Sequence, residues 1–251
     1  MKQPSPGEGE IDLAKEKLIL ANKILDLEKL ATPFGHISVR IPGTETFLIT
    51  RSIAPAMATL EDIVVCDMDG RVLKGKYNST YSEVVIHTGA YKIRKEFNSV
   101  VHTHSQYVIA LSMTGATVLP TDLTAIRVAP QPIALFEKMI YIDQPELGEE
   151  VASLLGPNKA VILKGHGALV VGKSIEDATY TARSLETAAK LQWLARAVGK
   201  LVPLTEEEKQ PVIEFQQKRS QEFMHGLQRE WAYFEFKLKK MGTPYFDLNM
   251  E

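Results

Sequence analysis

Ser99-Val100-Val101-His102-Thr103-His104 is an apolar run that ends in two histidines separated by a single residue. A run of this kind predicts a strand, whose side chains alternate between its two faces. His102 and His104 are therefore expected on the same face, near the end of the strand. Two imidazoles placed in this way are suited to holding a metal ion.

A third histidine stands in Lys164-Gly165-His166-Gly167, directly after the apolar run Ala160-Val161-Ile162-Leu163. The flanking glycines allow the backbone and a ligand to approach closely. Taken singly, each histidine would more often be a satisfied core or surface residue. The pair and the Gly-His-Gly loop together favour a catalytic metal site, since structural sites are usually closed by four protein ligands. We predict one divalent metal ion per subunit, zinc or manganese, bound by His102, His104 and His166.

Glu83 is the fourth candidate for this site. Ser82 is expected to cap a helix over 83–97, where a carboxylate in the first turn also interacts favourably with the helix dipole. That stabilising position is one interpretation of Glu83. Near a metal, it would instead act as a general acid and base or as a displaceable ligand. His87 follows one helical turn later, and we interpret it as structural.

Composition narrows the classes of protein. The chain has 251 residues, with 45% hydrophobic and 24% charged residues, which is typical of a globular protein. The net charge of −2 gives no reason to expect a nucleic acid or a membrane as partner, and no apolar run reaches the ~20 residues of a membrane span. Residues 1–10 are expected to form a flexible tail without the apolar core of a signal peptide, and residues 11–251 a single domain. The single cysteine, Cys66, fits a reducing, cytoplasmic location.

Periodicity and turn signals predict alternating helices and strands. The expected helices are 11–30, 83–97, a short helix capped by Ser105, 147–155, 174–198 and a last helical region from Thr205. The expected strands are 37–40, 47–50, 62–67, 71–73, the strand of His102, the run before His166 and 169–172, with short strands in a Pro-rich passage over 119–141. Because several strands are joined by hairpins, we expect an α/β fold with a mixed, largely antiparallel sheet that is covered by helices on both faces.

Four motifs resemble the class II aldolase/adducin family in their order and spacing, over roughly residues 13–194. They are Gly35-His36-Ile37-Ser38-Val39-Arg40, Tyr81-Ser82-Glu83, Val101-His102-Thr103-His104-Ser105 and Lys164-Gly165-His166-Gly167. The resemblance implies a three-layer α/β/α fold and a cyclic homotetramer with active sites at the subunit boundaries. It also implies that the three histidines bind a divalent metal. Glu83 would be a ligand in the resting state and a proton shuttle in turnover.

Three segments of the chain depart from the pattern of the sugar-phosphate aldolases that it resembles. Those aldolases form a phosphate cradle from Gly-Asn-x-Ser, Ser-Gly and Ser-Ser-Glu. The present chain has Gly35-His36-Ile37-Ser38, Thr50-Arg51-Ser52 and Tyr81-Ser82-Glu83 instead. The guanidinium of Arg51 suits a carboxylate, although a solvated loop arginine is the alternative. His36 adds a donor and Tyr81 an aromatic surface, so the expected substrate-binding residues are Arg51, Ser52, His36, Ser38 and Ser82.

This pattern resembles the decarboxylase branch of the family, which acts on hydroxylated aromatic or pyridine dicarboxylates. The leading hypothesis is therefore a metal-dependent carbon–carbon lyase of aromatic compound catabolism, a decarboxylase with a small carboxylate as substrate. An aldolase that cleaves a hydroxy-keto acid or a sugar derivative is the first alternative. A non-catalytic, adducin-like interaction module is the alternative of another class. The aromatic cluster over 223–246 is either ordinary helix packing or a lid over a neighbouring site.

Overall fold

The apolar run before His104 forms β5 (Ser99–Thr103), which lies inside an eight-stranded sheet. A computed structural model describes residues 7–218 and 220–242. Within them the strand order is β4-β3-β2-β1-β5-β8-β7-β6, and every neighbouring pair is antiparallel except β6 and β7. The other strands are β1 (His36–Arg40), β2 (Thr46–Thr50), β3 (Ile63–Asp67), β4 (Val72–Lys74), β6 (Ala134–Phe136), β7 (Ala160–Leu163) and β8 (Gly167–Gly172). The expected mixed, largely antiparallel sheet is confirmed.

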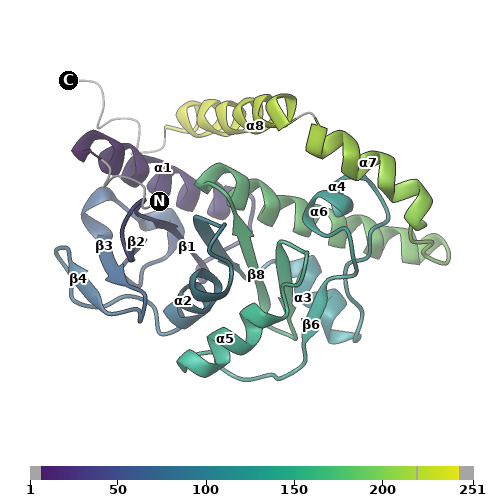
Figure 1. Ribbon diagram of the computed structural model, residues 1–251, viewed down its shortest axis with the longest axis horizontal. Helices are drawn as coiled ribbons and strands as arrows, with labels where there is room; N and C mark the ends of the chain where they lie inside the picture. Colours follow the sequence, from purple (N-terminus) through teal and green to yellow (C-terminus); the bar gives the residue numbers. More distant parts are fainter. Residues whose placement is uncertain (1–6, 219, 243–251) are drawn as a thin grey trace.

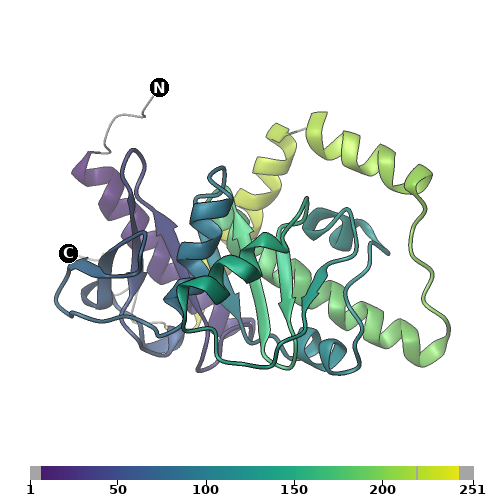
Figure 2. The same ribbon diagram turned by 60° about the horizontal axis from the view of Figure 1, so that its bottom comes forward.

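Helices cover both faces of this sheet, which gives three layers (Figure 1). They are α1 (Glu8–Leu27), α2 (Val84–Ile93), α3 (Gln106–Met113), α4 (Leu123–Val128), α5 (Pro145–Ser153), α6 (Ile175–Val198), α7 (Glu206–Lys218) and α8 (Ser220–Lys240), with short 3-10 turns at Pro55–Met57 and Leu60–Asp62. The two helices α2 and α5 pack side by side on one face, as the turned view in Figure 2 also shows. The long helices α1 and α6 cover the opposite face.

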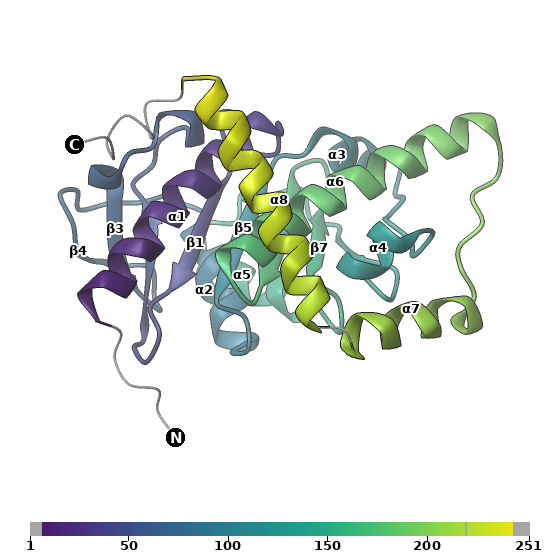
Figure 3. The same cartoon turned by 90° about the horizontal axis from the view of Figure 1, so that it is seen from above.

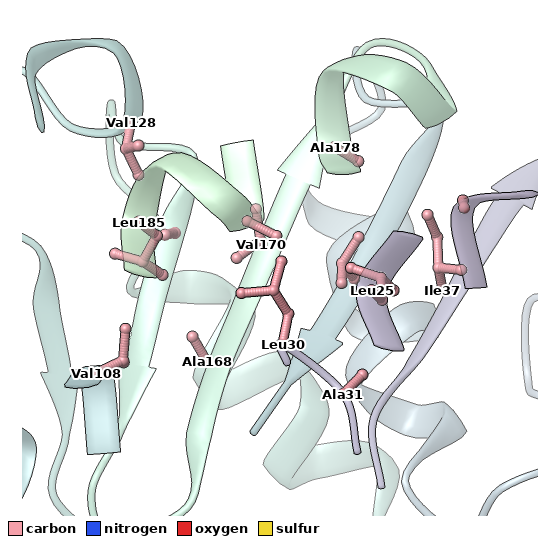
Figure 4. Packing of buried hydrophobic residues seen from close by; sticks show 14 of the residues in the cluster. Leu25, Leu30, Ala31, Ile37, Val108, Val128, Ala168, Val170, Ala178 and Leu185 are labelled. Atoms are coloured by element: carbon pink, nitrogen blue, oxygen red, sulfur yellow. The ribbon is translucent and has the colours of Figure 1, made fainter. Parts of the chain in front are cut away.

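The alternation of side chains along the strands divides the core between these two faces. Ile37 and Val170 point toward α1 and α6, where they pack with residues such as Leu25 and Leu185 (Figure 4). Neighbouring strand positions such as Val100 and Leu169 point to the other face and pack beneath α2 and α5. Since both faces are covered, both sets of side chains are withdrawn from water, which is the main favourable term in folding.

The pairing of β5 with its neighbours brings the functional motifs to one end of the sheet. His36 on β1 lies opposite His102 on β5, and Leu169 on β8 lies opposite His102 from the other side. The turn between β7 and β8 passes so close to β5 that a Cβ on Gly167 would lie 1.7 Å from the carbonyl oxygen of Thr103. Only glycine permits this approach, which places His166 beside the end of β5.

Three expected boundaries or elements were wrong. The Pro-rich passage over 119–141 contains the helix α4 and one strand, β6, in place of several short strands. Asp122 starts α4, because its carboxylate accepts hydrogen bonds from the amides of Thr124 and Ala125. Helix α2 ends at Ile93, four residues before the predicted end. Helix α1 begins at Glu8, inside the segment expected to be a tail, while residues 1–6 of that segment lie outside the described residues.

The last helix crosses over α1 and α6 (Figure 3). Phe234 and Leu238 of α8 are buried against Leu20 and Ile24 of α1, so this part of the aromatic cluster packs as ordinary core. The side chain of Phe223 and the residues from 243 onward lie outside the described part of the chain. None of the helices that the structure describes combines the length and the apolar character that a membrane span requires.

Substitution of Gly89 by alanine tests the packing of α2 on α5. A Cβ at Gly89 would lie 2.4 Å from the backbone of Gly148, so the helices would have to separate. We expect Gly89→Ala to lower the free energy of unfolding by about 1–3 kcal/mol in urea titrations. The matched control is Gly226→Ala in α8, where the new Cβ meets no atom within 4 Å. The control should be neutral or stabilising by up to about 1 kcal/mol, through helix propensity. Equal effects of the two changes would refute the close packing.

Candidate active site

Four side chains from three separate parts of the chain converge beyond the end of β5. One ligand atom from each of Glu83, His102, His104 and His166 lies within 4.8 Å of the others. The Nε2 atoms of His102 and His104 are 3.0 Å apart. The Glu83 carboxylate lies 3.5 Å from Nε2 of His102 and 3.4 Å from Nε2 of His166. The three imidazole rings stand nearly edge to face, with interplanar angles of 72–77°, so their nitrogens surround one point.

A backbone carbonyl orients the most buried of these rings. Nδ1 of His102 lies 3.1 Å from the carbonyl oxygen of Ala168 on β8. A carbonyl can only accept a hydrogen bond, so Nδ1 carries the proton and Nε2 directs its lone pair toward the cluster. This arrangement, in which the second ring nitrogen donates to a neighbouring oxygen, is typical of histidines that bind metals.

The residues fit a divalent cation. Oε1 of Glu83 is buried and has no hydrogen-bond partner among the described residues. Burial, with smaller effects from the rings of His102 and His166, lowers the pKa of His104 to about 3. Burial by itself would raise the pKa of Glu83, but the nearby rings of His102 and His166 hold it well below its usual range. Neutral imidazoles and an ionised carboxylate are the forms that bind a metal ion.

Local structure explains how these side chains reach the cluster. His104 lies one residue beyond β5, where its amide donates a hydrogen bond to the carbonyl oxygen of Leu30 at 2.8 Å. Glu83 is the N-cap of α2, not a residue of the first turn as predicted, and Ser82 precedes the cap. The Glu83 side chain makes no capping hydrogen bond. Its carboxylate is directed instead to the histidines.

A cavity of about 750 Å³ opens beside the cluster. Its lining includes three of the predicted substrate-binding residues, His36, Ser52 and Ser82. The ring of Tyr81 also lines it and stacks on the His36 ring with centroids 4.2 Å apart. No lysine or arginine is among the described residues of this lining.

The remaining two predicted binding residues do not line the cavity. Arg51 forms an ion pair with Asp62, with Nε 2.6 Å from Oδ1, and its guanidinium lies 4.5 Å from the centre of the Tyr77 ring. Ser38 is fully buried behind His36. Direct contact of Arg51 or Ser38 with a substrate stays a prediction.

The buried surroundings of Ser38 were missed in the sequence. Ser38 Oγ lies 2.6 Å from Nδ1 of His87 and 2.7 Å from the hydroxyl of Tyr91, and Nε2 of His87 lies 2.6 Å from Nδ1 of His36. The signal was the spacing, because positions 83, 87 and 91 share one face of a helix and positions 36 and 38 share one face of a strand. His87 is fully buried, as its structural interpretation requires.

Fold and site together define an α/β domain of the class II aldolase type. The family of the Class II Aldolase and Adducin N-terminal domain matches residues 16–193, and the chain belongs to it. The chain is 30% identical over 200 residues to 3,4-dihydroxyphthalate decarboxylase from Arthrobacter keyseri, covering 74% of this chain and 80% of the relative. It is 32% identical over 170 residues to L-fuculose phosphate aldolase from Methanococcus maripaludis (strain C5), covering 66% of this chain and 87% of the relative. An aldolase II superfamily protein from Pseudomonas syringae superposes with a TM-score of 0.79 at 27% identity, covering 97% of each chain.

Membership of the family establishes a general chemistry. Its members include lyases, both decarboxylases and aldolases, that act on small molecules, and the family is generally oligomeric. Class II aldolases use a divalent metal, and the present chain carries the histidine and glutamate cluster that could hold one.

Removal of one ligand tests the metal centre. We expect His102→Ala, His104→Ala and His166→Ala each to lose the metal on dialysis, because each change removes one of the four ligand groups of the cluster and so weakens the binding of the ion. The measurement is the metal content per chain after dialysis, by mass spectrometry. The control is His225→Ala, which changes an exposed histidine on α8. Full metal content in all three cluster variants would contradict the site.

Proposed function

We propose that this chain is a metal-dependent decarboxylase of a hydroxylated aromatic or heteroaromatic dicarboxylate. The observation that carries the proposal is the pair of rings of Tyr81 and His36, which lie with centroids 4.2 Å apart at an interplanar angle of 32° and both line the cavity beside the cluster. The altered phosphate-cradle positions and the relative from Arthrobacter keyseri support it. Zinc or manganese as the metal, a homotetramer as the assembly and the cytoplasm as the location belong to the same proposal.

The lining of the cavity supports a planar acid as substrate. The described lining includes His36 and Tyr81 at two positions where the phosphate cradle of the sugar-phosphate aldolases has asparagine and serine. Ser52 and Ser82 offer hydroxyl groups, and His36 offers a ring nitrogen, for a carboxylate that stays on the substrate. Apolar side chains such as Phe34 and Ile109 also line the cavity. They would disfavour the hydrated form of the carboxylate that departs.

Glu83 is suited to move the proton in this reaction. A divalent cation held by the cluster supplies a Lewis acid that stabilises negative charge on the substrate oxygen next to the departing carboxylate. The ionised Glu83 carboxylate would take the proton of the substrate hydroxyl. It would return that proton to the carbon that loses carbon dioxide, and the product oxyanion would take up one proton from water on release.

The proposal is tested by assaying the purified protein for carbon dioxide release. Hydroxylated aromatic dicarboxylates are incubated with the metal-free protein and with protein reloaded with zinc or manganese. We expect release only after reloading. Full activity after complete removal of the metal would contradict the proposal.

An aldolase is the second candidate, because the chain is 32% identical to L-fuculose phosphate aldolase. Product analysis separates the two, since an aldolase releases an aldehyde and a decarboxylase releases carbon dioxide. A non-catalytic, adducin-like role is disfavoured by the converged cluster, because a purely structural module has no need of four ligand groups around one point.

The proton-transfer role of Glu83 predicts the behaviour of Glu83→Gln. The amide keeps the size of the side chain but cannot accept and return a proton. We expect kcat to fall by about 10²–10⁴-fold, the range typical of general acid–base groups. The measurement is steady-state kinetics at saturating metal, with circular dichroism as the control for folding. Near-normal turnover would assign the proton transfer to another residue.

Arg51 is proposed to act through Ser52. Its ion pair with Asp62 holds the backbone next to Ser52, which lines the cavity. We expect Arg51→Ala to lower kcat/KM by about two- to fivefold, the value of a partly exposed ion pair, for monocarboxylates and dicarboxylates alike. Arg71→Ala, which removes an exposed arginine from the β3–β4 turn, is the control. A loss confined to dicarboxylates would place the guanidinium directly on a substrate carboxylate.

A further inference from the structure

We propose that Tyr91, Ser38 and His87 form a hydrogen-bonded column that fixes the proton of His36 on Nε2 and so presents a neutral donor to the substrate. The column is buried between β1 and α2. His36 and Ser38 share one face of β1, and His87 and Tyr91 lie one turn apart on α2. The identity of the acceptor, a carboxylate or developing oxyanion, rests on the proposed function. The direction in which the hydrogen bonds of the column donate, from Tyr91 toward His36, does not depend on the proposed function.

The column has three short hydrogen-bond links of 2.6–2.7 Å. The hydroxyls of Tyr91 and Ser38 are 2.7 Å apart, Ser38 Oγ is 2.6 Å from Nδ1 of His87, and Nε2 of His87 is 2.6 Å from Nδ1 of His36. Ser38 and His87 are fully buried and Tyr91 nearly so. Water is therefore excluded from the hydrogen bonds of the column. Each hydrogen bond must use a proton that belongs to one of the two side chains it joins.

The closed end of the column sets its direction. Tyr91 makes no other side-chain hydrogen bond within the described residues, and its hydroxyl is bonded only to Ser38. If Tyr91 accepted from Ser38, its own proton would be buried without an acceptor, which is costly. Tyr91 therefore donates to Ser38. The Arg40 guanidinium, 4.6 Å from the centre of the Tyr91 ring, favours this role, since a nearby positive charge makes the phenol a better donor.

The same reasoning carries along the column to the cavity. The proton of Ser38 has no acceptor other than Nδ1 of His87 among the described groups, so His87 carries its proton on Nε2 and donates it to Nδ1 of His36. A neutral imidazole has one proton, which for His36 is then on Nε2. His36 lines the cavity, with its ring centroid 5.1 Å from that of His102. It thus offers an N–H beside the cluster without adding a positive charge next to a bound cation.

Tautomer-resolved spectroscopy tests this assignment. The full-length protein is labelled with ¹⁵N-histidine and loaded with zinc, and the two-bond proton–nitrogen spectrum shows which ring nitrogen is protonated. Signals of His36 are identified by their loss in His36→Gln. We expect the Nε2–H form of His36 in the native protein. In Tyr91→Phe and in Ser38→Ala we expect a mixture of forms, because the direction of the column is no longer imposed.

Kinetics and metal content separate a positioning role from general damage. We expect Tyr91→Phe and Ser38→Ala to lower kcat/KM by about tenfold, the value of one hydrogen bond to a charged group, with normal zinc content. The control is Thr88→Val, a buried polar change next to His87 whose hydroxyl bonds only to the carbonyl of Val85. Thr88→Val should leave the tautomer spectrum of His36 unchanged and kcat/KM within about twofold of the native value, because the changed side chain lies outside the hydrogen-bond network.

Two results would overturn the column. One is a His36 proton on Nδ1 in the native, zinc-loaded protein. The other is an unchanged His36 spectrum in both Tyr91→Phe and Ser38→Ala. A native Nε2–H form that becomes mixed in these variants supports the column even if no carbon dioxide is released from any acid, in which case only the proposed function fails.

Discussion

The antiparallel pairing of β5 with β1 on one side and β8 on the other is the constraint on which the site depends. It sets His36 opposite His102, and it supplies the Ala168 carbonyl that holds the His102 ring. Because strand side chains alternate, a slip of one residue would turn His102 from the α2 face of the sheet to the α1 face. Strong hydrophobic pairs such as Val101 and Val170, both fully buried, make that slip costly.

The sequence predicted what depends on local periodicity and failed where a tertiary partner decides. Residues two apart on a strand must share a face, so the convergence of His102 and His104 followed from their spacing. The ion pair of Arg51 with Asp62 could not be predicted in the same way. Asp62 belongs to a 3-10 turn, and the periodicity of the sequence does not show that this turn lies beside Arg51. The hydrogen bond of Tyr91 to Ser38 could not be predicted from the sequence either. Its four-residue spacing from His87 indicates a shared helix face but not the strand that the face meets.

Neutral groups surround the charged ones at the site. Burial keeps the pKa of His36 and His87 below the usual range, as it does for His104, so these three imidazoles add no charge. Glu83 is then the source of negative charge in the cluster, and such a set of lone pairs is suited to a cation. The same neutrality suits a reaction in which negative charge develops on the substrate, because fixed donors stabilise it without having to reorganise.

Helix α2 contributes residues both to the histidine and glutamate cluster and to the hydrogen-bonded column. Its N-cap provides Glu83 to the cluster, and the next two turns provide His87 and Tyr91 to the column, all along one face. Any movement of α2 along its axis would therefore shift the Glu83 carboxylate and the His87 ring that contacts His36 together. The contact of Gly89 with Gly148 holds α2 close to α5, because a Cβ at Gly89 would lie 2.4 Å from the backbone of Gly148. A glycine that does not line the cavity thus supports the helix that carries Glu83 and His87.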